Sequence, residues 1–299
     1  MGKGLILLYH RVANQPVDPF QLCVTADNFR GHLEYLQRRA AVVPLSEMPR
    51  KSTSNRIAIT FDDGYRDNAE IAAPAVAAAG LPVTWFITVG RLGGHRFWWD
   101  RLTHAILGGH PLPAYLEIDL PSGQVWLSLC TWEARLRALN LLHHRIRPLR
   151  PADVESVVDK VTSVLDAPPP PPDSTTMTTD QLLAIARHPQ ADIGAHTLSH
   201  VQLRGQSIDL KRREVIGSVT QLSSMLRRPI RSFAYPYGSP RAVDREAQRL
   251  AKEAGCDLAC STNAGLVESG RGRYLLPRIA VGNWSAAAFA QQVEAAFNR

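Results

Sequence analysis

Strand-like and helix-like segments alternate along most of this chain, and the alternation limits the possible folds more than any other feature. Short apolar runs at 5–9, 56–61 and 191–195 have the length of buried strands. An alanine-rich helical pattern spans 68–79, and Gly80 closes it. Such alternation is typical of a parallel sheet closed or wound by helices, so we expect an α/β fold.

The same patterns predict further elements in both halves of the chain. Thr25 and Asn28 are candidate caps for a helix that carries Phe29, Leu33 and Leu36 at helical spacing. Ser285 can cap a last helix. We also expect strands at 41–45, 83–89, 231–235 and 257–261, and helices at 179–186, 209–226 and 245–254.

Residues 91–175 interrupt this alternation. The segment begins with the aromatic run Phe97-Trp98-Trp99-Asp100 and has a helical face of Trp132, Leu136, Leu139 and His143. Its prolines at 168–172 predict a stiff, extended linker. We therefore expect one domain made of 1–90 and 176–299, with 91–175 as a partly helical insertion. The insertion either packs on the outside of this domain or places its aromatic residues as a wall over a site.

Composition excludes several classes of protein. The formal net charge of +7 suits either a solvated surface or attraction to an anionic glycan, a lipid or a membrane surface. No nucleic-acid-binding motif accompanies the charge, so we expect no nucleic acid partner. The four cysteines lack zinc-finger spacing and predict reduced, mostly buried thiols. No segment has the pattern of a signal peptide or a membrane span, which predicts a cytoplasmic protein, with peripheral membrane contact as an alternative.

Two motifs carry candidate chemistry. Asp62-Asp63-Gly64 follows the strand pattern at 56–61, and His196 and His200 lie four residues apart after the pattern at 191–195. One carboxylate and two imidazoles form a three-ligand set for a catalytic metal, which leaves the second carboxylate to serve as a base. Each motif alone is weak, because Asp-Asp before Gly commonly marks a turn with solvated acids.

Strand polarity predicts that these residues meet. His10, Asp62, His196 and the Pro236-Tyr237 turn each come directly after a predicted strand. In an α/β barrel the carboxyl ends of the parallel strands share one face, and that face holds the active site. We therefore expect the four segments to converge.

The motifs resemble those of a known family. Thr60-Phe61-Asp62-Asp63-Gly64, the His196/His200 pair and the segment 233–238, which contains Pro236-Tyr237-Gly238, resemble the polysaccharide deacetylases, the NodB-like enzymes of carbohydrate esterase family 4. The resemblance covers 1–90 and about 176–299, and it implies a distorted (β/α) barrel with an inserted segment. No histidine follows His200, and Tyr9-His10 comes first, as in the circularly permuted poly-N-acetylglucosamine deacetylases.

The resemblance also implies roles for individual residues. Asp63, His196 and His200 match the ligands of one divalent metal, with Zn²⁺ as the first choice and Co²⁺ or Ni²⁺ as alternatives. Asp62 matches the base that deprotonates a metal-activated water. The backbone N–H of Tyr237 matches a stabiliser of the oxyanion.

His10 and Arg278 fill two gaps in the family pattern. His10 is the candidate acid that protonates the departing amine, and its alternative is a core or loop histidine satisfied by the backbone. The family often has an arginine two residues before the motif proline, but this chain has Ala234 there. Arg278 is the first candidate to orient Asp62 instead, and Arg11 and Arg66 are the others.

The expected function is therefore metal-dependent removal of an N-acetyl group from an amino sugar in a glycan, a glycolipid or a sugar precursor. One alternative keeps the metal site but cleaves an ester or a non-sugar amide. The other is a glycan-binding protein without catalysis. A fold alone does not separate these functions, because function depends on the site.

Overall fold

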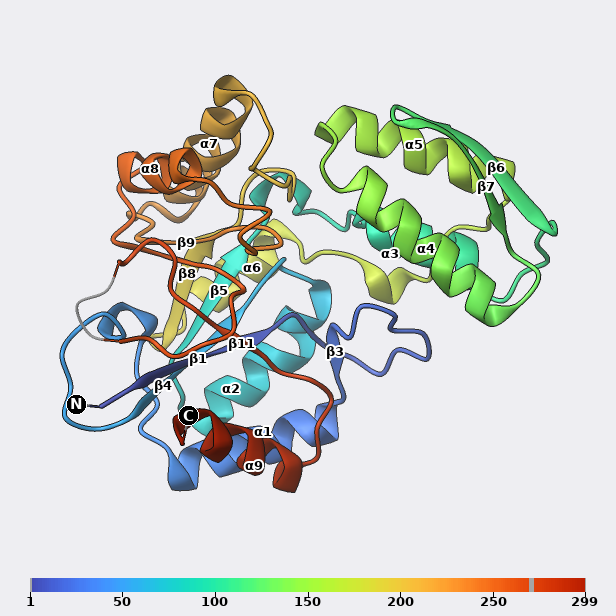
Figure 1. Ribbon diagram of the computed structural model, residues 1–299. Coiled ribbons are helices and arrows are strands. Elements are labelled where there is room, and N and C mark those ends of the chain that lie inside the picture. The colour runs from blue at the N-terminus through green and yellow to red at the C-terminus, as the bar shows by residue number, and fades with distance from the viewer. Residues whose placement is uncertain (1, 269–271, 299) are drawn as a thin grey trace.

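The expected α/β fold is confirmed. The computed structural model describes residues 2–268 and 272–298. Its main sheet has seven parallel strands in the order β10-β9-β8-β5-β4-β1-β11 and curls into a half-barrel (Figure 1). These strands are β1 Gly4–Tyr9, β4 Arg56–Phe61, β5 Val83–Ile87, β8 Ala191–Ala195, β9 Ser232–Ala234, β10 Leu258–Cys260 and β11 Ile279–Ala280.

Apolar side chains fill both faces of the sheet, as a parallel sheet requires. On β1, Leu5 and Leu7 belong to the large core under the helices, while Ile6 belongs to a smaller core together with Phe86 and Cys260. This division follows from the alternation of side chains along a strand. The strands are therefore held rigidly, and so are the residues that follow their carboxyl ends.

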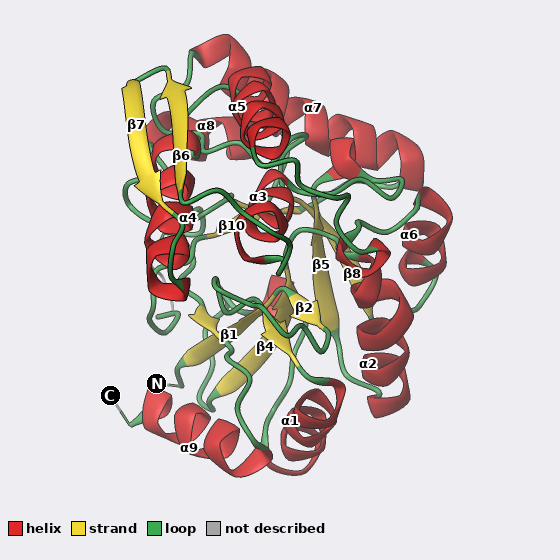
Figure 2. Cartoon of the chain, turned by 90° about the vertical axis from the view of Figure 1, so that its right-hand side faces the viewer, coloured by secondary structure: helices red, strands yellow, loops and turns green. Residues whose placement is uncertain are grey.

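Helices pack against the outer face of the sheet (Figures 1 and 2). Ser285 caps α9 by accepting a hydrogen bond from Ala288 N, as the sequence predicted. These helices are α1 Ala26–Arg39, α2 Ala73–Ala79, α6 Thr179–Ala186, α7 Ile208–Leu226, α8 Arg245–Glu253 and α9 Ala286–Phe297.

The segment after β5 forms a separate lobe, drawn in green at the right of Figure 1. It has its own hydrophobic cluster, and this supports the proposal that 91–175 is an insertion. Of the helical face that the sequence indicated, Leu139 is buried in α4, together with Leu142, whereas Trp132 begins the helix with 46% of its surface exposed. The lobe consists of α3 Trp98–Leu107, β6 Tyr115–Leu120, β7 Gly123–Ser128, α4 Trp132–Ile146 and α5 Pro151–Val164.

Other predicted elements differ from the structure in their detail. Residues 41–45 form no strand: Val42 makes one bridge to Ile57, and a 3₁₀ turn begins at Leu45 after Pro44. The predicted helix at 68–79 begins with a π-helical turn, Asn68–Ala72, ahead of α2. Two short strands, β2 Arg11–Val12 and β3 Cys23–Val24, pair beside the main sheet.

Two predictions from composition can be compared with the described residues. All four cysteines are free thiols, and Cys130 is the exposed one. Within 2–268 and 272–298, no helix is both long enough and apolar enough to cross a membrane.

Candidate metal and catalytic site

The candidate site lies where parallel strands end. Asp62 and Asp63 follow β4, His196 follows β8, and His10 follows β1. Because these strands are parallel, their carboxyl ends lie along one edge of the sheet. The predicted convergence of the motifs therefore occurs in the structure.

Asp63, His196 and His200 come together as one buried group. Each offers a ligand atom, and these atoms lie within 4.8 Å of one another. Asp63 Oδ1 lies 3.4 Å from His196 Nε2 and 3.2 Å from His200 Nε2. One oxygen and two nitrogens at this spacing match a three-ligand set for a divalent metal.

The unpaired atoms of this group fit a metal better than a hydrogen-bond network. Asp63 Oδ1 is buried and forms no hydrogen bond with the described residues, although both imidazoles face it. His196 Nδ1 donates to the carbonyl of Ala234 at 2.7 Å, which leaves Nε2 as the nitrogen with the free lone pair. Buried polar atoms without partners are costly, and a cation would satisfy them.

Strained backbone holds the same residues. Asp63, His200 and Tyr237 have φ values of 75°, 62° and 60°, and Thr197 has 65°. Non-glycine residues rarely adopt this left-handed region, and its cost is of order 1–3 kcal/mol each. Gly238, at φ 51°, follows in a place where a Cβ would come within 2.4 Å of Thr262 N. Strain of this kind concentrates at functional sites.

Asp62 is bound by Arg278 through two hydrogen bonds. Arg278 Nη1 donates to Oδ1 at 2.7 Å and Nη2 to Oδ2 at 2.6 Å, and both side chains are almost completely buried. Burial alone would raise the pKa of Asp62, but the charge of Arg278, with a smaller effect from His196, lowers it below its ordinary value. Arg278 directly precedes β11.

The other two candidate arginines lie elsewhere. Arg11 pairs with Asp67 at 2.9 Å, and Arg66 pairs with Glu70 at 2.7 Å on the surface. Neither hydrogen bond reaches Asp62, so of the three candidates Arg278 has the geometry for orienting that carboxylate.

His10 is partly buried and lies close enough to Asp62 and Asp63 to influence their ionisation. Its positive form would lower the pKa of Asp62 and of Asp63, although for both groups it is a minor influence. Asn68, in the π-helical turn, donates to the His10 carbonyl at 2.8 Å and fixes the backbone. Among the hydrogen bonds of the described residues, none involves the imidazole ring of His10. The ring is therefore available to a substrate.

Tyr237 also borders the metal-ligand group. Its ring lies edge-on to the ring of His200, with 4.8 Å between the centroids. Its carbonyl accepts from Thr262 Oγ1 at 2.7 Å, whereas its N–H donates to no group in the part of the chain that the structure describes. A free N–H at this position suits the predicted stabilisation of an oxyanion.

The inserted lobe supplies one wall of the site. The ring of Trp99 lies 4.5 Å from that of His200, and the ring of Phe97 lies 5.7 Å from it. Trp99 Nε1 donates to the hydroxyl of Tyr65, which in turn donates to Asp100 at 2.9 Å. Of the two expectations for the insertion, the structure therefore favours an aromatic wall over the site.

Glu214 on α7 is a residue that the sequence did not reveal. Its buried carboxylate accepts hydrogen bonds from Leu198 N, Ser199 N and Ser199 Oγ, at 2.9, 2.9 and 2.8 Å. It thereby fixes the loop between His196 and His200. No local motif marks this glutamate, because its partners are backbone groups on a distant turn.

Comparison with known proteins agrees with this geometry. Residues 160–259 match the family model described as polysaccharide deacetylase. A curated relative, the putative polysaccharide deacetylase YxkH of Bacillus subtilis, is 20% identical over 98% of this chain and 77% of its own length.

Solved deacetylases have the same fold. The Streptococcus pyogenes deacetylase PplD, in complex with acetate, has a TM-score of 0.62 at 16% identity and matches over 97% of both chains. IcaB from Ammonifex degensii has a TM-score of 0.64 at 16% identity, and the match covers 100% of this chain and 98% of that one. The predicted resemblance is confirmed: residues 160–259 match the polysaccharide deacetylase family model, and the chain has the fold of solved deacetylases.

Proposed function

We propose that this protein is a metal-dependent hydrolase that removes an N-acetyl group from an amino sugar in a glycan, a glycolipid or a sugar precursor. One observation carries the proposal. A buried carboxylate bound by an arginine, Asp62, lies beside a separate set of metal-ligand atoms, with Asp62 Oδ2 4.0 Å from His196 Nε2. A base next to a three-ligand set is the arrangement needed for hydrolysis by an activated water.

Asp63, His196 and His200 would hold the metal. Bound there, a divalent ion would lower the pKa of a water and polarise an acyl oxygen. Imidazole and carboxylate donors suit Zn²⁺, and they suit Co²⁺ and Ni²⁺ as well. Zn²⁺ remains our first choice because the three protein ligands match a catalytic zinc set.

The proton transfers are assigned to two side chains of the protein. Asp62 accepts a proton from the attacking water, because Arg278 keeps its carboxylate ionised and oriented. His10 protonates the departing amine, which is a poor leaving group without that proton. The N–H of Tyr237 donates to the oxygen that becomes negative during the attack.

Acetate release from N-acetylglucosamine oligomers tests the proposal. The wild type loaded with Zn²⁺ should release acetate and leave free amines, and Asp62→Asn should keep the metal while losing about 10²–10⁴-fold in rate. The His196→Ala/His200→Ala double variant should lose the metal as well. Asp257→Asn, a change at an exposed carboxylate away from the site, is the matched control.

Three outcomes would contradict the assignment. Full metal content in the His196→Ala/His200→Ala variant would contradict the assignment of these two histidines as metal ligands. Loss of metal in Asp62→Asn, with retention in Asp63→Asn, would reverse the two aspartate roles. Release of acetate from O-acetyl sugars but from no N-acetyl sugar would favour the esterase alternative.

A further inference from the structure

Arg147 directly follows α4 of the inserted lobe and lies close to the candidate site. The central carbon of its guanidinium, Cζ, lies 5.3 Å from the centroid of the Tyr237 ring, and that ring lies 4.8 Å from the ring of His200. The attraction between a cation and a tyrosine ring holds the guanidinium in this position. One aromatic ring therefore separates the charge of Arg147 from a candidate metal ligand.

No group in 2–268 or 272–298 neutralises this arginine. Its guanidinium takes part in no hydrogen bond and no ion pair with these residues, and its Nε is buried without a partner. Arg147 as a whole is only partly buried, so a ligand can reach it. Buried donors without acceptors are costly, and a ligand with acceptor oxygens would satisfy them.

The surroundings of Arg147 favour negative charge. A narrow hollow between the lobe and the sheet is lined by Arg147, Arg91 and His200, and no acidic side chain of the described residues lines it. Arg91 pairs with Glu155, which also accepts from Arg101 at 2.9 Å. Because two arginines already share that glutamate, the charge around the hollow is positive.

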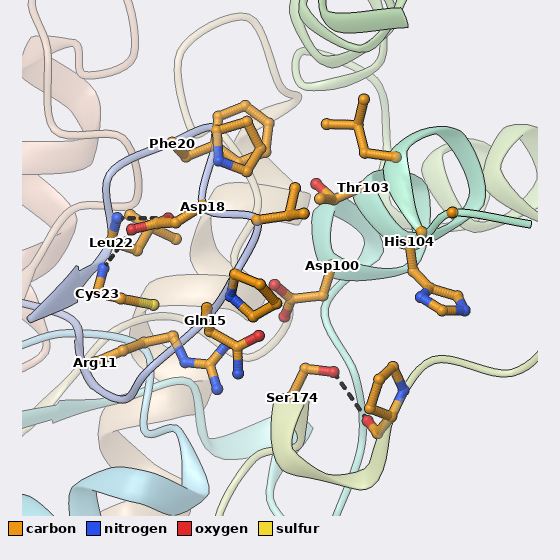
Figure 3. Close-up of a pocket in the computed structure, with 17 residues that line it drawn as sticks. Arg11, Gln15, Asp18, Phe20, Leu22, Cys23, Asp100, Thr103, His104 and Ser174 are labelled. Atoms are coloured by element: carbon orange, nitrogen blue, oxygen red, sulfur yellow. Dashed lines mark hydrogen bonds between the residues drawn. The ribbon is translucent and has the colours of Figure 1, made fainter. Parts of the chain in front are cut away.

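The charged groups of another cavity are already bound. Figure 3 shows this cavity, between the loop that joins β2 to β3 and helix α3, with Arg11 and Asp18 in its wall. Arg11 pairs with Asp67 at 2.9 Å, and Asp18 accepts from Leu22 N and Cys23 N, both at 2.9 Å. The arginine of this cavity therefore has its anion within the protein, in contrast to the arginine that follows α4.

We propose that Arg147 binds an anionic group of the substrate, a phosphate or a carboxylate carried next to the acetamide. The inference rests on the proposed function and deepens it, because it makes the substrate a negatively charged N-acetyl sugar. In a 2-acetamido sugar, C1 and C3 flank the carbon that carries the acetamide, so an anionic substituent on either lies near the acyl group. The planar fork of a guanidinium matches the oxygens of phosphate and of carboxylate.

Binding to the Asp62→Asn protein loaded with Zn²⁺ tests this without turnover. Three sugars are titrated by calorimetry: N-acetylglucosamine, its 1-phosphate, and N-acetylmuramic acid, which carries a carboxylate on its C3 substituent. The parent should bind at least one charged sugar about tenfold more tightly than the neutral one, or better. Arg147→Gln in the same background should lose this preference, while its affinity for N-acetylglucosamine stays the same.

Two further variants control for total charge and for misfolding. Arg137 is exposed on α4, so Arg137→Gln removes the same charge from the same helix and should keep the preference. Arg147→Lys keeps a cation but not the bidentate geometry, so it should keep the preference only in part. Circular dichroism and melting temperature show whether each variant is folded. If Arg147→Gln does not fold, Arg147→Lys decides, and full retention of the preference there would overturn the proposal.

The pattern across the three sugars decides the rest. A preference for the 1-phosphate identifies the anion as a phosphate, and a preference for N-acetylmuramic acid identifies it as a carboxylate. A preference that folded Arg147→Gln retains would place the anion on the metal and overturn the proposal. Absence of any preference in the parent would overturn it as well, and so would equal weakening of all three sugars in Arg147→Gln.

Acetate release by the wild type separates this inference from the proposed reaction. Release without any preference that depends on Arg147 defeats the inference alone. Binding of a charged sugar that depends on Arg147, without release of acetate from any of the three sugars, defeats the proposed reaction and leaves an anion site.

Discussion

Arg278 binds both carboxylate oxygens of Asp62 although 216 residues separate them in the sequence, with hydrogen bonds of 2.7 and 2.6 Å. Arg278 Nε also donates to the carbonyl of Ser261 at 2.9 Å, which holds the guanidinium in place. The position two residues before the motif proline carries Ala234 in this chain, so the arginine that faces the base comes from a different segment. The Arg278–Asp62 pair is bidentate, a geometry that lysine does not reproduce.

Removing Arg278 should move the acid limb of the pH–rate profile to higher pH. In Arg278→Ala the burial of Asp62 remains while the main influence that lowers its pKa is lost, so the carboxylate becomes protonated at a higher pH. Stability should fall by about 3–5 kcal/mol, because a buried charge loses its partner. Acetate release measured from pH 4 to 9 (roughly the range of stable enzymes) and chemical denaturation check both effects.

The conservative variant separates orientation from charge. Arg278→Lys keeps a cation near Asp62 but loses one hydrogen bond, so its acid limb should shift less than that of Arg278→Ala while kcat still falls. Metal content should match the wild type in both variants. An acid limb that stays in place in Arg278→Ala would show that Arg278 does not control the ionisation of Asp62.

Glu214 should control metal affinity without touching the metal-ligand atoms. Glu214→Gln replaces one accepting oxygen with an NH₂ group that faces the N–H donors of the 198–199 turn. The loop carrying His200 should then loosen, and metal affinity should fall about 10–100-fold. Competition with a metal chelator measures this affinity directly.

The control for Glu214 is another glutamate of the helical layer. Glu253 lies at the surface with 37% of its side chain exposed and pairs with Arg212 and Arg249, so Glu253→Gln should leave metal affinity unchanged. Equal chelator competition by wild type and Glu214→Gln would show that the loop holds His200 without this carboxylate.

The sequence predicted those features whose signals are local. Strand polarity and the spacing of Asp62, Asp63, His196 and His200 were enough to predict that these residues converge, because parallel strands place their carboxyl ends together. The cap at Ser285 depends on a neighbour three residues away, and the helices α6 and α9 begin where the pattern indicated.

The features that the sequence missed depend on distant partners. Glu214 acts on backbone groups of another element, and the wall formed by Trp99 depends on how the lobe docks. Trp132 has an apolar ring at a helix start, but α4 packs against α3 and β7 with Ala138, Leu139 and Leu142 inward and leaves Trp132 exposed. Tertiary contacts decide such cases, and a helical pattern alone does not contain them.

Asp100 should make stability depend on pH. Burial raises its pKa to about 7, against the lowering effects of Arg11 and of the hydrogen bond from Tyr65. The pKa of Asp100 in the folded protein therefore lies above the unfolded value of about 3.9. The contribution of Asp100 to the free energy of unfolding is fully present below pH 3.9 and is lost as the pH rises through 7. Asparagine does not ionise, so the Asp100→Asn protein should not show this pH-dependent loss of stability.

Denaturation of both proteins at several pH values measures the effect. The stability of Asp100→Asn relative to the wild type should rise between about pH 4 and pH 7 by a few kcal/mol at most and then level off. A stability difference that stays constant across this window would show that the folded protein keeps Asp100 ionised.

His10 should be needed for amides more than for activated esters. An amine leaves only after protonation, whereas an activated phenolate or similar group leaves without a proton. His10 is not one of the three metal-ligand residues, and its carbonyl keeps the hydrogen bond from Asn68 in the variant, so His10→Ala should keep the metal and the fold. Acetate release from an N-acetylglucosamine oligomer should fall by about 10²–10⁴-fold, and hydrolysis of an activated acetate ester should fall far less. Equal losses on the two substrates, at equal metal content, would make His10 a structural residue and leave the departing amine without its proposed acid.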